Sequence, residues 1–193
     1  MKPKNETVRR QIIDAATDLI IETGIAGTST VKVAKRINGA QSNIYSYFKS
    51  KEALIAGVFD YHQKLITATL APALEDATSP KALITSVASA LFEFATTHPT
   101  SIQIIAAFRA QPSLRHQLPA IDENDVFTKL FGLFRRYQQD GLIKPIPAEF
   151  LAEATFSIIV DYCNAKLAGE AYTSALDETT VAQLIADLVL LRA

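Results

Sequence analysis

Apolar residues recur at steps of three and four along most of the chain, which is the period of an α-helix. In the first segment they are Val8, Ile12, Ala16, Leu19 and Ile20, which line one face of a helix. The 8 prolines and 7 glycines fall mostly between such segments. Because no stretch shows the sustained alternation of a strand, the pattern predicts an all-α fold.

Turn and cap residues set approximate boundaries for these helices. Gly24 is a natural stop for the first helix. Ser50 can cap a long helix that Pro72 is expected to end. The expected helices span about 5 or 7–23, 40–48, 51–70, 80–97, 100–110, 123–140, 147–168 and 178–192, with a short one around 33–37.

Apolar run length and cysteine content exclude several classes of protein. The longest unbroken apolar run is Ile104–Phe108, whereas a membrane-spanning helix needs about 20 apolar residues. The N-terminal positive charges have no apolar stretch behind them, so no secretory signal is expected. The single cysteine, Cys163, cannot form an intrachain disulfide and fits a reducing compartment. We therefore expect a cytoplasmic protein.

Motifs of catalysis and of metal binding are also missing. The sequence has no glycine-rich phosphate loop, no G-x-S-x-G elbow, no H-E-x-x-H and no C-x-x-C. His62, His98 and His116 lie far apart in the chain and do not form a metal motif. The sequence therefore predicts no enzyme, no cofactor and no metal site.

Charge is distributed unevenly along the chain. Residues 1–51 hold nine Lys and Arg against four Asp and Glu, a net charge of +5, whereas residues 52–193 carry −6. A basic N-terminal segment followed by an acidic remainder suggests that the N-terminal segment binds a polyanion. The alternative is that short segments simply fluctuate in charge.

The segment 28–51 has the pattern of a helix-turn-helix. Thr28 and Ser29 can cap a short helix, and Asn38 and Gly39 can form the turn after it. On a helical wheel the next helix has one anchoring side and one polar, uncharged side. The anchoring side holds Ala40, Ile44, Tyr47 and Phe48, and the polar side holds Ser42, Tyr45 and Ser46, flanked by Gln41 and Asn43.

Short polar groups without charge suit the edges of bases in the major groove. Cations around them suit phosphates, although each could equally be a solvated surface charge. These cations are Arg9, Arg10, Lys32, Lys35, Arg36, Lys49 and Lys51.

The last two expected helices are apolar on nearly all sides. A narrow polar line, from Glu149 to Asp161 at four-residue steps, interrupts the first of them. Such helices must be buried on more than one side, either in the centre of the monomer or against a second copy of the chain. We expect a dimer interface that includes Phe150, Ile158, Tyr162, Leu184, Leu188 and Leu191.

The run NIYSYFKSKEALIAGV, residues 43–58, resembles the signature of the TetR family of transcriptional regulators. TSTVKVAKRI, residues 28–37, resembles the second helix of that family. The resemblance implies a homodimer with a helix-turn-helix DNA-binding domain in residues 1–50 and a helical ligand-binding and dimerisation domain in residues 51–193.

By matched position, the resemblance also assigns roles to single residues. Those expected to contact mainly phosphates are Thr28, Ser29, Tyr45, Tyr47 and Lys51, and those nearest the bases are Gln41, Ser42, Asn43 and Ser46. Tyr47 has two interpretations. The helical wheel favours packing in the core, and the family pattern favours contact with the DNA backbone.

The turn departs from the family pattern A-G-V-S. Asn38 can replace the glycine, since asparagine tolerates a left-handed backbone. Gly39 removes an apolar anchor between the helices. Ala40 removes the usual serine cap, at about 1 kcal/mol unless another group caps the helix.

We therefore expect a ligand-responsive repressor, associated with the nucleoid, that binds a palindromic DNA operator as a homodimer. A small hydrophobic effector would release it by favouring another conformation. The expected pocket residues, which could equally be ordinary core, are Phe59, His62, Phe92, Phe108, Phe127, Phe131, Phe134 and Phe156. The alternatives are a DNA-binding protein without an effector, a helical protein adaptor, and a helical enzyme or metal protein.

Overall fold

The computed structural model describes residues 5–75, 77–111 and 124–191 of the 193-residue chain. Within these ranges the regular structure is helical, apart from an isolated antiparallel bridge between Ile143 and Leu190. The predicted all-α class is therefore confirmed. No helix in the described ranges is both long and apolar enough to span a membrane.

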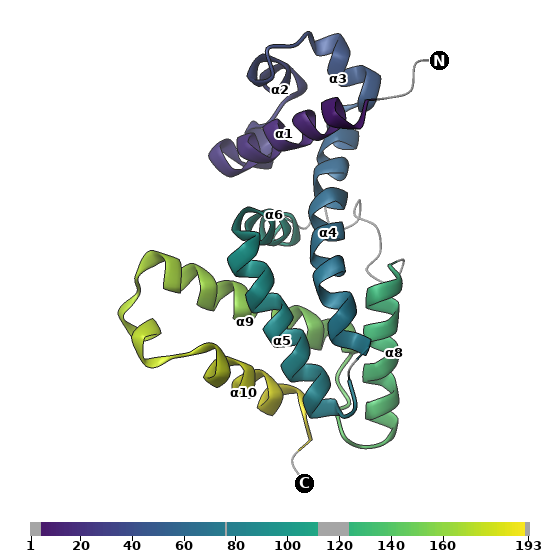
Figure 1. Cartoon of the computed structure of the whole chain (residues 1–193), viewed down its shortest axis with the longest axis vertical. Coiled ribbons are helices and arrows are strands. Elements are labelled where there is room, and N and C mark those ends of the chain that lie inside the picture. The colour runs from purple at the N-terminus through teal and green to yellow at the C-terminus, as the bar shows by residue number, and fades with distance from the viewer. Residues whose placement is uncertain (1–4, 76, 112–123, 192–193) are drawn as a thin grey trace. The chain divides into compact units, whose positions relative to one another are not determined.

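The helices follow the expected order (Figure 1). Their bounds are α1 Glu6–Gly27, α2 Thr30–Arg36, α3 Gln41–Tyr47, α4 Lys51–Glu75, α5 Pro80–Thr97, α6 Pro99–Arg109, α8 Asp125–Gln139, α9 Ala148–Ala168, the 3-10 helix η2 Ala171–Ala175, and α10 Glu178–Val189. The described residues form two compact units. The first contains 5–64 and 103–111, and the second contains the remainder. The division predicted at residue 50 concerns function and stays a prediction.

The first unit has one apolar core, which α1, α2, α3, the beginning of α4 and the end of α6 build together. The predicted stripe on α1 faces this core, since its members are buried or, for Val8, partly buried. Thr17 and His62, which are also buried, form a hydrogen bond of 3.0 Å between α1 and α4. The fully buried members of the core include Ile12, Ala16, Val33, Ile44 and Leu54.

In the second unit α5 lies against α9 and α10, and α8 packs against α9. The side chain of Lys144 closes the end of α10, because its Nζ donates to the carbonyl oxygens of Asp187 and Leu188 at 2.8 Å each. A cation at the C-terminus of a helix satisfies carbonyls that have no helical partner. Fully buried core residues here include Leu83, Phe94, Leu151, Ile159 and Ile185.

Two predicted helix ends differ from the structure. Gly24, with φ 72° and ψ 170°, breaks the backbone of α1, but one further turn continues to Gly27. The prediction that Pro72 ends α4 is wrong, because the helix continues to Glu75. Burial of Leu74 in the turn after Pro72 offsets the backbone hydrogen bond that proline cannot donate.

The turn between α2 and α3 relies on Asn38. Its φ is 52°, the only positive value at a non-glycine residue in the described ranges. Asn38 N donates to the Lys35 carbonyl at 3.2 Å and Gly39 N donates to the Ala34 carbonyl at 2.9 Å. These two bonds form the left-handed helix ending that glycine usually supplies. Asparagine therefore replaces the family's glycine, as the sequence predicts.

Gly57 lets α4 approach the residue that follows α3. A Cβ built on Gly57 would lie 2.5 Å from Cε1 of Phe48, which is closer than real Cβ contacts come. The Phe48 ring is only 5% exposed, so it has little room to move away. The missing side chain at position 57 therefore sets how closely Phe48 packs on α4.

Replacing Asn38 with alanine should destabilise the protein by about 1 kcal/mol, because alanine tolerates the left-handed backbone poorly. Asn38→Gly should stay within a few tenths of a kcal/mol of the wild type. Urea unfolding followed by helical circular dichroism measures both variants. Asn164→Ala on α9 is the control, since that residue is exposed in ordinary helix. Equal stability of the two Asn38 variants would refute the role given to this turn.

Two glycine-to-alanine substitutions should have opposite effects on stability. Gly132→Ala on α8, where an added Cβ meets nothing within 4 Å, should stabilise by about 0.5–1 kcal/mol through helix propensity. Gly57→Ala should destabilise by about 1–3 kcal/mol, since it overpacks the Phe48 ring. Thermal unfolding compares them. Stabilisation by both would contradict the close packing described here.

Candidate nucleic-acid interface

The exposed face of α3 is polar and uncharged, as the helical wheel predicts. Ile44 is fully buried and Phe48 nearly so, and Tyr47 is partly buried against the same core. Ala40, predicted on this anchoring side, is exposed instead, because it stands before the helix as its N-cap. The residues left exposed on α3 are Gln41, Ser42, Asn43, Tyr45 and Ser46.

Some of these polar side chains are held by partners within the chain. Ala40 gives α3 no side-chain cap, and Gln41 Nε2 donates instead to Thr30 Oγ1 at 3.0 Å, which ties the start of α3 to α2. The Ser46 hydroxyl donates to the carbonyl of Asn43 at 2.7 Å. Tyr45 is 43% exposed, which suits a side chain that reaches outward.

Thr28 and Ser29 lie between α1 and α2 and stabilise the ends of these helices. Ser29 Oγ accepts from the backbone N–H of Lys32 at 3.2 Å, so it caps α2 as predicted. Thr28 is fully buried, and its hydroxyl donates to the Gly24 carbonyl at 3.0 Å. Both hydroxyls predicted to meet phosphate therefore have partners inside the protein.

The predicted phosphate cations divide into two groups. Lys32 Nζ donates to the Gly27 carbonyl at 2.6 Å, and Lys51 Nζ to the Ala26 carbonyl at 3.1 Å. The other cations with partners are Arg36 with Glu22, Arg10 with Asp14 and the Tyr61 ring, and Arg9 over the Phe48 ring. Within the described chain, Lys35 and Lys49 are exposed and form no ion pair.

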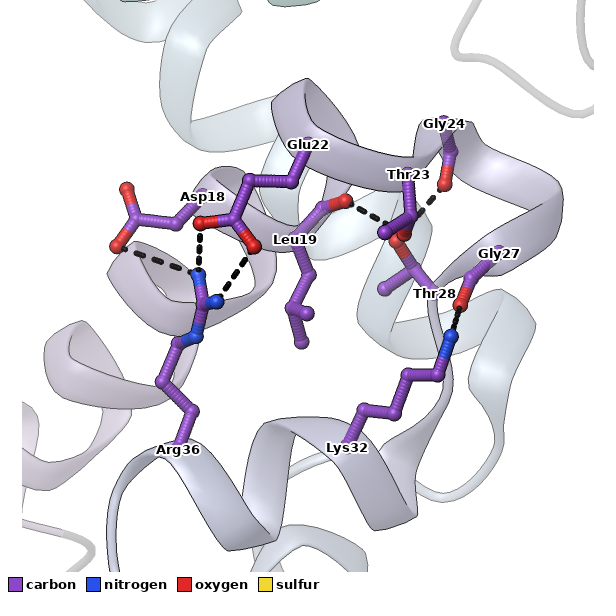
Figure 2. A network of polar contacts seen from close by, with 9 residues as sticks. All are labelled: Asp18, Leu19, Glu22, Thr23, Gly24, Gly27, Thr28, Lys32 and Arg36. Atoms are coloured by element: carbon purple, nitrogen blue, oxygen red, sulfur yellow. Dashed lines mark hydrogen bonds and ion pairs between the residues drawn. The ribbon is translucent and has the colours of Figure 1, made fainter.

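Arg36 forms the most extensive of these contacts (Figure 2). Its Nη1 donates to Glu22 Oε1 at 2.9 Å, and its Nη2 donates to Glu22 Oε2 at 2.6 Å. Asp18 Oδ2 lies 3.8 Å from Nη1. The hydrogen bond from Arg36 lowers the pKa of the Glu22 carboxyl below its ordinary value of 4.5.

The predicted pocket residues are divided between the two units. In the first, the rings of Phe59 and Phe108 lie 5.3 Å apart in the core, and His62 bonds Thr17. In the second, Phe127 and Phe131 stack at 6.2 Å. The other members, Phe92, Phe134 and Phe156, are buried in the second unit. A pocket made of these residues stays a prediction.

Two grooves lie within the described part of the second unit, and both are lined by a mixture of polar and apolar side chains. One, of about 580 Å³, lies between α5 and α10 and includes Phe92. The other, of about 510 Å³, lies between α4 and α5. Thr85, Ser89 and Glu93 border both grooves. The sequence reasoning missed this face, although polar residues recur there every four positions from Lys81 to Glu93.

The residues predicted for self-association differ in exposure. Phe150 is 64% exposed, Leu184 57% and Leu191 44%, while Ile158 and Leu188 are partly exposed. Tyr162 instead points inward, where it packs on Phe92 and its hydroxyl donates to the Leu176 carbonyl at 3.2 Å. The exposed apolar residues also include Leu167 and Tyr172, which the sequence reasoning did not select.

The described residues contain no cluster of histidine, cysteine and carboxylate side chains that could hold a metal ion. His116 lies outside the described residues. Burial raises the pKa of the Cys163 thiol, which makes this cysteine a poor nucleophile.

Comparisons with known proteins agree with this geometry. Residues 12–58 match the family model described as bacterial regulatory proteins of the tetR family. A transcription regulator of known structure from Lactobacillus plantarum is 27% identical, with a TM-score of 0.75 over 95% of this chain and 99% of that one. A TetR family regulator from Marinobacter aquaeolei VT8 has a TM-score of 0.80 over the whole of both chains at 21% identity, which shows the shared fold.

A curated relative, the fatty acid metabolism regulator protein of Bacillus subtilis, is 43% identical over 49 residues, a quarter of each chain. The segments matched in the curated relatives span less than a third of their length. The family match covers the helix-turn-helix, and the likeness of fold extends over the remainder. On this evidence residues 12–58 are similar to the DNA-binding segment of the TetR family of bacterial transcriptional regulators, and the chain as a whole shares the fold of solved proteins of that family.

Proposed function

We propose that this regulator is a repressor that binds a palindromic operator as a homodimer and leaves it when a small effector binds. The observation that carries the proposal is the outer face of α3. It is polar, uncharged and exposed, while Ile44 and Phe48 anchor the opposite side. Such a face can enter the major groove and form hydrogen bonds with base edges.

Base contacts are assigned first to Ser42 and Asn43, which are exposed at the start of α3. The N-terminal residues of a recognition helix are those that reach base edges. Gln41 and Ser46 also lie on this face, although each has a partner within the chain. Asparagine and glutamine pair well with adenine, and serine is less selective.

Phosphate contacts are assigned to Ser29, which caps α2, to Tyr45 on α3, and to the exposed Lys35 and Lys49, which lie in the last turn of α2 and just after α3. The family pattern adds Thr28, Tyr47 and Lys51. For Thr28, which is fully buried and bonds the Gly24 carbonyl, contact with phosphate would require rearrangement, whereas the Lys51 ammonium keeps two donors besides its bond to Ala26. Contacts to phosphate supply affinity and register rather than choice of sequence.

Exposed apolar side chains on α9 and α10 support self-association. Phe150 and Leu184 are each more than half exposed, and such surface is unfavourable in water unless a partner covers it. A twofold dimer would present two copies of α3, which must lie about 34–36 Å apart to read half-sites one helical turn apart.

The proposed effector is a small hydrophobic molecule that binds among the middle helices. It would act only through its different affinities for the DNA-bound and released conformations. Phe92 is the predicted pocket residue that borders a groove. The relative named for fatty acid metabolism matches only the N-terminal quarter of the chain, so its name identifies no effector here.

Base readout can be tested by selecting bound duplexes from a random DNA pool and measuring affinity for the recovered site. Asn43→Ala should weaken binding to that site about tenfold or more and leave binding to unrelated duplex nearly unchanged. Lys35→Ala with Lys49→Ala should weaken both and reduce the dependence on salt. Lys81→Ala on α5 is the matched charge control. Wild-type affinity of the Asn43 variant would remove α3 from base readout.

The dimer can be tested by placing a carboxylate on α10. Leu184→Glu should convert the dimer to a monomer, because the interface would then bury an unpaired charge, and light scattering after gel filtration reports the mass. Ile21→Glu on α1, where the side chain is 46% exposed, is the control and should stay dimeric. A wild-type protein that is itself monomeric would exclude this part of the proposal.

A further inference from the structure

The short helix α2 is joined to α1 by polar contacts near both of its ends (Figure 2). Near its start, Lys32 Nζ donates to the Gly27 carbonyl at 2.6 Å. At its last residue, Arg36 forms two parallel hydrogen bonds with Glu22, of 2.9 and 2.6 Å. Paired bonds between a guanidinium and a carboxylate fix relative orientation as well as distance.

The apolar contribution of α2 to the core is small, which makes these contacts important. Of its seven residues, only Thr30, Val33 and Ala34 are buried. Val33 and Ala34 are small side chains, and Ile37 at the end of α2 is only partly buried against the same core, so the apolar surface that fixes the position of α2 is limited. A bidentate ion pair at the end of the helix restricts its rotation on α1 in a way that small apolar contacts do not.

The position of α3 depends in turn on α2. The helix α2 packs against both α1 and α3. Asn38 and Gly39 close the turn between them by hydrogen bonds to α2 carbonyls, and Gln41 bonds Thr30. Any rotation of α2 on α1 would therefore carry the exposed face of α3 with it.

The surroundings of Arg36 argue against a direct contact with phosphate. Its side chain is 32% exposed and faces two carboxylates, Glu22 and Asp18, which are themselves 53% and 63% exposed. A phosphate that took the same two N–H groups of Arg36 would displace both hydrogen bonds to Glu22. The two carboxylates would then face the DNA polyanion without their cation.

We propose that Arg36 is a positioning residue, which with Glu22 holds α2 on α1 and thereby sets the orientation of α3 for DNA, and that it is not a phosphate contact. The inference rests on the proposed DNA-binding function. It names a pair of residues, outside the DNA-reading face, on which that face depends.

The pKa of Glu22 agrees with this assignment. Because the hydrogen bond from Arg36 lowers it in the folded protein, the pair contributes fully above the ordinary pKa of glutamate. The contribution is lost as the pH falls through the lowered value. At neutral pH the pair is therefore intact.

The two roles predict opposite effects of Glu22→Gln on binding of the selected duplex. Removing a negative charge near DNA should strengthen binding if Arg36 contacts phosphate, since it frees that cation. If Arg36 positions α2, Glu22→Gln should weaken binding by about three- to tenfold. Arg36→Gln should weaken it similarly, with the salt dependence unchanged. Glu6→Gln, which removes an exposed acid from the same helix, is the matched control.

A charge swap provides the decisive variant. Glu22→Arg combined with Arg36→Glu keeps the ion pair but places an acid at position 36, so it should recover affinity relative to the single Arg36→Glu variant. Hydrogen exchange of the α2 amides in the DNA-free protein should be faster in both single glutamine variants and slow again in the swap.

Two results would overturn the inference. One is unchanged or tighter binding by Glu22→Gln. The other is a lower salt slope, by about one charge, for Arg36→Gln with unchanged exchange in α2. If the wild type fails to bind duplex DNA at all, the proposed function fails instead, and the exchange measurement still decides whether the pair holds α2.

Discussion

Burial of Ile44 and Phe48 in the core of the first unit is the constraint on which the proposed DNA-reading surface depends. These two anchors determine which side of α3 turns outward, and that side carries amides and hydroxyls without charge. The close approach of Phe48 to α4 requires glycine at position 57. The orientation of α3 is thus set by its packing on the core of the first unit and by its contacts with α2, before any DNA is present.

Cations in the first unit serve two purposes that composition alone does not separate. Lys32 and Lys51 satisfy carbonyls at the end of α1, where the helix dipole favours positive charge. Lys35 and Lys49 remain available at the surface. A hydrogen bond to a carbonyl does not neutralise a lysine, so the net positive charge of the N-terminal residues is consistent with DNA binding.

Much of the fold could be predicted because helical periodicity is a local property of the chain. The stripe on α1, the cap at Ser29 and the left-handed turn at Asn38 follow from residues close in sequence. The errors arose where distant contacts decide. The helix α4 continues beyond Pro72 to Glu75, and Leu74 in that last turn is buried. Arg36 pairs with Glu22, which lies 14 positions earlier in the chain on another helix. A helical wheel of a single segment does not show such a contact.

The sequence by itself determined the helical class, the helix-turn-helix segment and the resemblance to the TetR family, because each is encoded in short-range patterns of apolar, polar and turn residues. Only the tertiary structure decided which hydroxyls and cations already have partners within the chain and which aromatic residues are buried in a core. It also decided which contacts join α2 to α1. Those outcomes depend on the packing of helices from separate parts of the chain, and hydrogen bonds form only between groups that the packing brings within about 3 Å.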